Sequence, residues 1–70
     1  RYAGQEPLRV LVPKLGKLAE HADARVRADA CHYLGLSRSP LARAFLTPRL
    51  SDDSAEVREI AGDSLAELEE

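Results

Sequence analysis

The chain has 70 residues, enough for one small domain, with 44% apolar residues, 31% charged residues and a net charge of −2. No apolar run approaches the roughly 18 residues that a membrane span needs, so a membrane-spanning segment is excluded. The single cysteine, Cys31, excludes an internal disulfide and favours a reducing, cytoplasmic setting.

Charge is distributed unevenly along the chain. Residues 1–35 hold six Lys and Arg against four Asp and Glu, whereas residues 36–70 hold four against eight. This disfavours nucleic-acid binding by the second half, because phosphates require cations. The chain begins with Arg1 in place of Met and shows no leader pattern, so we expect it to be part of a larger protein.

The first predicted helix begins after Glu6, with Pro7 in the first turn, where proline is tolerated. Pro13 lies inside this stretch and removes a backbone hydrogen bond, so we expect a kink near residues 9–13 or a later start. Apolar residues spaced three and four apart predict one buried stripe. Its members are Leu8, Leu11, Val12, Leu15, Leu18 and Ala19.

The second predicted helix has Asp23 as its N-cap and ends near Gly35. The third follows Ser39, another good N-cap, and should be kinked or closed by Pro48. The residues expected to face inward are Val26, Ala30, Tyr33 and Leu34 in the second helix, and Leu41, Phe45, Leu46 and Leu50 in the third.

The fourth predicted helix is capped by Asp53, because Asp53 and Glu56 have the spacing of a capping box. Its inward stripe is Val57, Ile60, Ala61, Leu65 and Leu68. The connections between the four helices are short, so consecutive helices should run antiparallel. No stretch alternates with a period of two residues, and the predicted fold class is therefore all-α.

Parts of the sequence repeat. The pair Val26-Arg27 recurs as Val57-Arg58, and the same offset of 31 relates Ala30 to Ala61 and Leu34 to Leu65. Upstream, residues 11–15 (LVPKL) are similar to residues 46–50 (LTPRL) at an offset of 35. Two helices per unit and a period of 31 to 35 residues predict an α-solenoid fragment, with unit one over about 7–36 and unit two over about 39–69.

This pattern of an acidic turn, a Val-Arg pair and then Ala and Leu resembles the HEAT repeats, in particular their short bacterial form first noted in phycobilisome lyases. The resemblance implies a right-handed stack, with the first helix of each unit on the convex side and the second helices lining the concave side. It also implies that Arg27 and Arg58 form a structural ladder with turn carboxylates and carbonyls. Asp52 matches the turn aspartate of the family, whereas His21 occupies that place in unit one, so Asp23 would have to substitute there.

A catalytic or metal site is not predicted. Cys31 and His32 are adjacent in a helix and point about 100° apart, so they cannot face each other as a nucleophile and its base. The spacing of His21, Asp23 and His32 matches no common metal site. We therefore expect neither catalysis nor a cofactor, and Cys31 to be a small interior residue.

The outward face of the second helices is the candidate partner-binding surface. The alternative is that its side chains are simply solvated charges. A mixed, acidic-leaning groove would accept a basic peptide or helix. The residues on this face are Arg25, Asp29, His32, Glu56, Glu59 and Asp63.

These observations predict a non-catalytic protein-interaction or scaffold module. The alternatives are a helical accessory domain of an enzyme and, with less support, a nucleic-acid-binding HEAT-like module. Two units are fewer than the three or so that a solenoid usually needs, so an open end could also form a homodimer.

Overall fold

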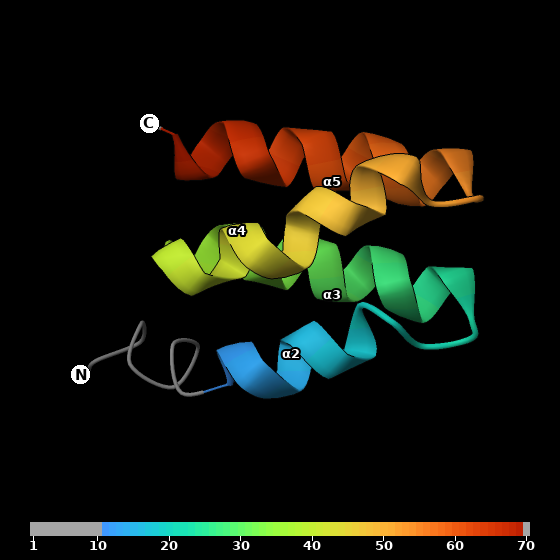
Figure 1. Ribbon diagram of the computed structural model, residues 1–70, viewed down its shortest axis with the longest axis horizontal. Helices are drawn as coiled ribbons and strands as arrows, with labels where there is room; N and C mark the ends of the chain where they lie inside the picture. Colours follow the sequence, from blue (N-terminus) through green and yellow to red (C-terminus); the bar gives the residue numbers. More distant parts are fainter. Residues whose placement is uncertain (1–10, 70) are drawn as a thin grey trace.

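The computed structural model of the chain describes residues 11–69. These residues form four α-helices and one 3₁₀ helix and contain no strand, which confirms the predicted all-α class. Consecutive helices run antiparallel (Figure 1). The elements are α2 (Val12–Leu18), α3 (Ala24–Ser37), α4 (Pro40–Leu46), η1 (Thr47–Ser51) and α5 (Ala55–Leu68).

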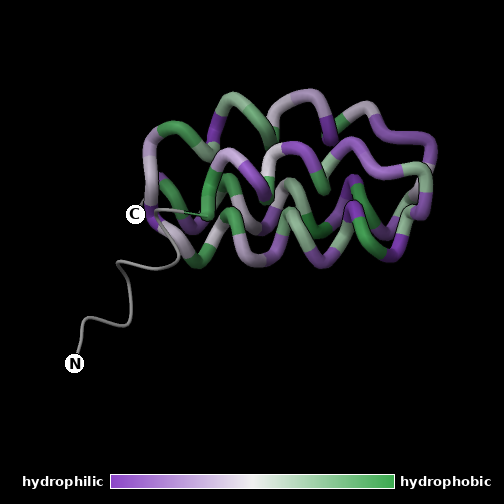
Figure 2. The backbone as a smooth tube through the Cα atoms, turned by 90° about the horizontal axis from the view of Figure 1, so that it is seen from below, coloured by the Kyte–Doolittle hydropathy of each residue, from purple (hydrophilic) through white to green (hydrophobic). Residues whose placement is uncertain are grey.

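The helices form two layers, which Figure 2 shows edge-on. One layer contains α2, α4 and η1, and the other contains α3 and α5, which pack along each other. Each layer therefore contains one helix from each half of the chain, and in the first layer η1 extends α4. This is the arrangement of two stacked helical hairpins, in which each hairpin buries one side against the other.

Helix starts follow their capping residues at two of the three predicted sites. The Asp23 side chain accepts from the Arg25 backbone N–H, and the Ser39 side chain accepts from that of Leu41, as predicted. The prediction of Asp53 as the cap of α5 is wrong. Ser54 holds the extended N-cap conformation and accepts from the Val57 N–H at 3.4 Å.

Prolines set where the first-layer helices begin and end. α2 starts at Val12, so Pro13 is at its second position, where a missing N–H is not needed for the helix. The predicted start at Pro7 lies outside the described residues, as does Leu8. In the second half, α4 ends at Leu46 and Pro48 lies in η1, in agreement with the predicted kink or closure.

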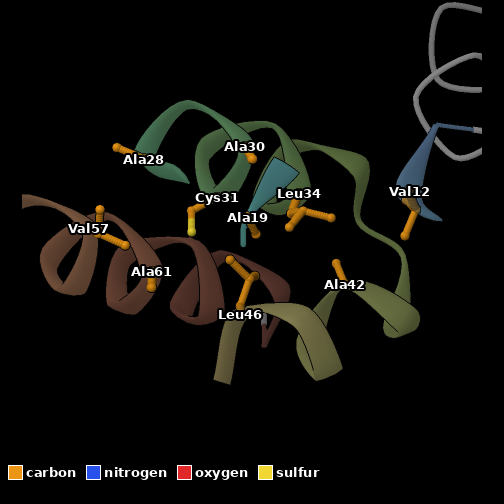
Figure 3. Close-up of a cluster of buried hydrophobic side chains, with 10 residues drawn as sticks. All are labelled: Val12, Ala19, Ala28, Ala30, Cys31, Leu34, Ala42, Leu46, Val57 and Ala61. Carbon is orange, nitrogen blue, oxygen red and sulfur yellow. The ribbon is translucent and has the colours of Figure 1, made fainter. Parts of the chain in front are cut away.

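The core is built mostly from small side chains, with Leu34 and Leu46 as its largest fully buried members (Figure 3). Ile60, Leu65 and Leu68 of the predicted α5 stripe pack against it. The fully buried apolar residues are Val12, Ala19, Ala28, Ala30, Cys31, Leu34, Ala42, Leu46, Val57 and Ala61.

Five residues predicted to face inward are exposed instead. Tyr33 is 47% exposed and Leu41 is 65% exposed, and Ala42 takes the inward position beside Leu41. The spacing of apolar residues identifies the apolar face of a helix, but two hairpins bury only part of each apolar face, so some of its residues stay exposed. The full set of corrected positions is Leu11, Leu18, Tyr33, Leu41 and Leu50.

α3 and α5 approach each other closely at Gly35 of α3. A Cβ placed on Gly35 would lie 2.7 Å from Cβ of Ser64 and 3.0 Å from its Cα. Ser64 itself donates its hydroxyl to the Cys31 carbonyl at 2.8 Å, which joins α5 to α3. The absence of a side chain at Gly35 therefore sets the distance between the two helices.

Replacing Gly35 by Ala should destabilise the fold relative to the same change at Gly62, where an added Cβ would meet only Leu50 Cδ2 at 3.9 Å. Both changes gain helix propensity, up to about 1 kcal/mol. Overpacking against Ser64 should then leave Gly35→Ala less stable than Gly62→Ala by about 1–3 kcal/mol. Urea unfolding of the two variants measures this difference, and equal stabilities would contradict the close approach.

Candidate functional site

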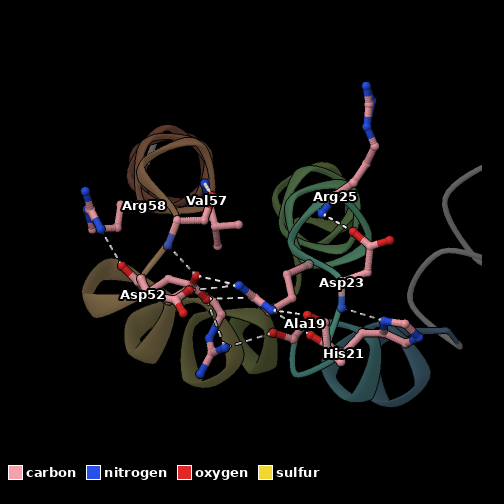
Figure 4. A network of polar contacts seen from close by, with 12 residues as sticks. Ala19, His21, Asp23, Arg25, Asp52, Val57 and Arg58 are labelled. Carbon is pink, nitrogen blue, oxygen red and sulfur yellow. Dashed lines mark hydrogen bonds and ion pairs between the residues drawn. The ribbon is translucent and has the colours of Figure 1, made fainter.

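Arg27, at the start of α3, connects the two hairpins (Figure 4). Its Nε and Nη2 donate to the two carboxylate oxygens of Asp52, both at 2.9 Å, and Nη2 also reaches Asp53 at 3.0 Å. Nη1 donates to the carbonyls of His21 and Ala22 in its own turn. The two-pronged geometry of a guanidinium is suited to such a carboxylate pair.

Asp52 is the centre of the network, with a side chain that is only 3% exposed. It accepts from Arg27, from Arg49 at 3.2 Å and from the Ser54 backbone N–H at 2.9 Å. The hydrogen bond from Arg27 is the largest of the effects that lower the pKa of Asp52 to about 2. The carboxylate is therefore ionised at neutral pH and fixes the turn before α5.

Arg49 and Arg58 complete the contacts around this turn. Arg49 donates to the Ala19 carbonyl at 3.1 Å and to Asp52, and so forms a second connection between the hairpins. Arg58 donates to the backbone carbonyl of Asp52. The role of Arg49 was missed in the sequence, where its counterpart at offset 35 is Lys14, a cation without the forked donor geometry of a guanidinium.

The turn of unit one is held differently. His21 Nδ1 accepts from the Asp23 N–H at 3.0 Å, in the same way that Asp52 accepts from the Ser54 N–H. The Asp23 carboxylate is occupied with the N-cap of α3 and does not hydrogen-bond Arg27. His21 thus reproduces the turn geometry of Asp52 without its charge, and Asp23 does not substitute for the turn aspartate as a hydrogen-bond partner.

The six residues of the predicted partner-binding face are all exposed. None of them forms a side-chain ion pair with another residue in 11–69. α3 also exposes Leu36, 42% accessible and four residues after His32, which gives the charged face an apolar position that the sequence reading missed. The face consists of Arg25, Asp29 and His32 on α3 and of Glu56, Glu59 and Asp63 on α5.

The arrangement offers no support for nucleophilic chemistry at Cys31. Its side chain is fully buried and points from α3 towards α5 (Figure 3), whereas His32 is exposed. Burial raises the pKa of the Cys31 thiol to about 11, so the thiolate is scarce at neutral pH. Cys31 acts as a small apolar residue at the contact between the hairpins.

Comparison with known families gave a match over most of the chain. The family model described as HEAT repeats covers residues 4–66 of the chain. No curated protein and no solved structure matched. Among the described helices, none combines the length and apolar character needed to cross a membrane.

Asp52→Asn should weaken the fold in a pH-dependent way, because it removes the charge while keeping an acceptor for the Ser54 N–H. The pKa of Asp52 falls from about 3.8 to about 2 on folding. Its carboxylate therefore adds stability above about pH 4, and this is lost as the pH falls through about 2. Urea unfolding should show a difference between wild type and variant at pH 7 that shrinks in acid.

Asp53→Asn is the matched control, since the Asp53 side chain is 92% exposed although it also contacts Arg27. Its effect should be small at both pH values. Equal losses from the two variants at pH 7 would show that the buried position of Asp52 has no special role. A difference between wild type and Asp52→Asn that persisted at pH 2 would contradict the ionic origin of the effect.

Proposed function

The chain belongs to the HEAT repeat family, and we propose that it works as a non-catalytic protein-interaction or scaffold module. The proposal rests on the difference between the charged residues that pair at the contact between the hairpins and those that stay unpaired on the outward face of the part of the chain that the structure describes. The side chains of Arg27, Arg49 and Asp52 form ion pairs at the contact between the hairpins, whereas the six residues of the partner-binding face form no side-chain ion pair within residues 11–69.

The proposed ligand is a basic peptide or helix of a partner protein. On α5 the face presents Glu56, Glu59 and Asp63, and on α3 it presents Leu36 beside the mixed charges. A partner with cationic side chains around an apolar anchor matches this arrangement in charge and in hydrophobicity. Charge at the rim would mainly set selectivity and association rate, and the apolar anchor would contribute most of the affinity.

Self-association is a second proposal about partners. Leu11, the N-cap of α2, and Leu18, its last residue, lie seven residues apart on one side of the helix, and both are at least 40% exposed. Burying them against a second copy would remove apolar surface from water. Light scattering across a concentration range tests this, and a monomer at every concentration would contradict it.

The alternatives are less well supported. If the chain is a helical accessory domain of an enzyme, the interaction face would be the same, but its partner would be part of that enzyme. Nucleic-acid binding is disfavoured because the α5 side of the face is acidic and would repel phosphates. A cytoplasmic location is proposed from the single cysteine, which is free and buried in the core.

Selection of displayed random peptides on the immobilised chain tests the proposed face. The enriched sequences should be basic. A synthetic peptide of that sequence should bind the double variant Glu59→Lys and Asp63→Lys at least about tenfold more weakly, which is about 1.4 kcal/mol.

The matched control reverses two charges in the other layer, Lys14→Glu with Lys17→Glu on α2, and should bind the peptide as wild type does. Enrichment of acidic peptides would contradict the proposal. So would binding by the control that is tighter by a similar factor, because the control makes the chain more negative and the effect would then follow net charge and not position.

A further inference from the structure

α2 carries two exposed cations beside two exposed leucines. Leu11, Lys14 and Leu18 lie at positions i, i+3 and i+7, so they share one side of the helix, and Lys17 lies beside Lys14. Neither lysine forms an ion pair with another of the described residues. The helix itself contains no acidic residue. These four residues are called the α2 row below.

α5 carries an acidic row with the same spacing. Glu56, Glu59 and Asp63 also lie at positions i, i+3 and i+7, and all three are exposed. They lie on the side of α5 opposite the buried Val57 and Ala61. A helix rises 1.5 Å per residue, so the α2 row and the acidic row are each about 10 Å long.

The two rows of one chain cannot meet. α2 and α5 lie at opposite edges of the molecule, with α3 and α4 between them (Figure 1). Within residues 11–69 the two helices make no contact with each other. The α2 row can therefore reach the acidic row of another copy, but not its own.

The rows match in charge as well as in length. Lys14 and Lys17 are three residues apart, and so are Glu56 and Glu59, which lets two cations face two carboxylates at once. Leu36 of α3 supplies an exposed apolar position on the same face as the acidic row. A leucine of the α2 row that packs against Leu36 would remove apolar surface of both from water.

We propose that the α2 row of one copy of the chain docks on the acidic row of a second copy. This inference rests on the proposed function, because it identifies the basic partner of the partner-binding face as the chain itself. The two rows lie in different layers, so each contact leaves one row free on either copy. Further copies can then add to the free rows, and the assembly grows beyond a dimer.

Two neutralised variants test the contact, because each weakens one row and keeps the other. The acidic-row variant carries Glu59→Gln with Asp63→Asn, and the α2-row variant carries Lys14→Gln with Lys17→Gln. All four side chains are exposed, so both variants should keep the helical circular dichroism of the wild type. Analytical ultracentrifugation over a range of concentrations measures the mass of the wild type, of each variant and of their equimolar mixture.

The mass of the wild type should rise beyond that of two chains as its concentration increases. Each variant alone should associate at least about tenfold more weakly. In the mixture, the intact α2 row of one variant can bind the intact acidic row of the other. The mixture should therefore associate as tightly as the wild type, but its mass should stop at two chains, because both remaining rows are neutralised.

The matched control neutralises two exposed acids outside the acidic row, Asp53→Asn with Glu69→Gln, and changes the net charge by the same two units as the acidic-row variant. It should associate as the wild type does. Equal weakening in this control, or a mixture that associates no more tightly than the variants alone, would overturn the proposal.

Two further outcomes separate this inference from the proposals on which it builds. Undiminished association of the acidic-row variant would overturn it and leave a contact between two α2 rows. A wild type that stays a monomer at every concentration would overturn it as well. The proposed function would survive that result if the selected basic peptide still binds the partner-binding face, and it fails separately if the peptide does not.

Discussion

The buried ion pair between Arg27 and Asp52 is the interaction on which the rest of the structure depends. It joins the first turn of α3 to the turn before α5, and the same aspartate orients the backbone that Ser54 needs to cap α5. Buried pairs of this kind often add little net stability, because desolvation offsets the attraction. Such a pair instead fixes the register of the two hairpins, since a shift of one hairpin along the other would leave a buried charge without its partner.

The register that this ion pair sets at the start of α3 and α5 explains how the two helices pack further along. With the turns fixed, Gly35 meets Ser64 two to three helical turns further along, and Cys31 and Ala61 fill the space between. At these positions the side chains are small, so the two helices come close. The charged side chains that do not take part in the contact remain on the outward surface.

Much of the fold could be predicted from the sequence because it depends on local signals. The spacing of apolar residues predicted the helices, and Asp23 and Ser39 predicted two of the starts. Ser54 was missed because its neighbour Asp53 has the better capping-box pattern, and only the structure shows Asp53 turned towards Arg27. The exposure of Leu11 or Tyr33 depends on what covers the end of the stack, which spacing cannot reveal.

The candidate site shows the same limit. The offset of 31 pairs Arg27 with Arg58, yet it does not indicate that the carboxylates bound by Arg27 come from the following hairpin. Nor does the sequence distinguish Arg49, which connects the hairpins, from Arg43, whose contact is with Glu69 at the exposed end of α5. Such contacts arise only when the two units are stacked.

A double-mutant cycle on Arg27→Gln and Asp52→Asn tests most directly whether this pair couples the two hairpins. The free energy of unfolding would be measured in urea at pH 7 for the wild type, both single variants and the double variant. We expect the double variant to be about as stable as the less stable of the single variants, because either change already breaks the pair. Losses that simply add would show that the two side chains stabilise the fold separately, and would contradict the account.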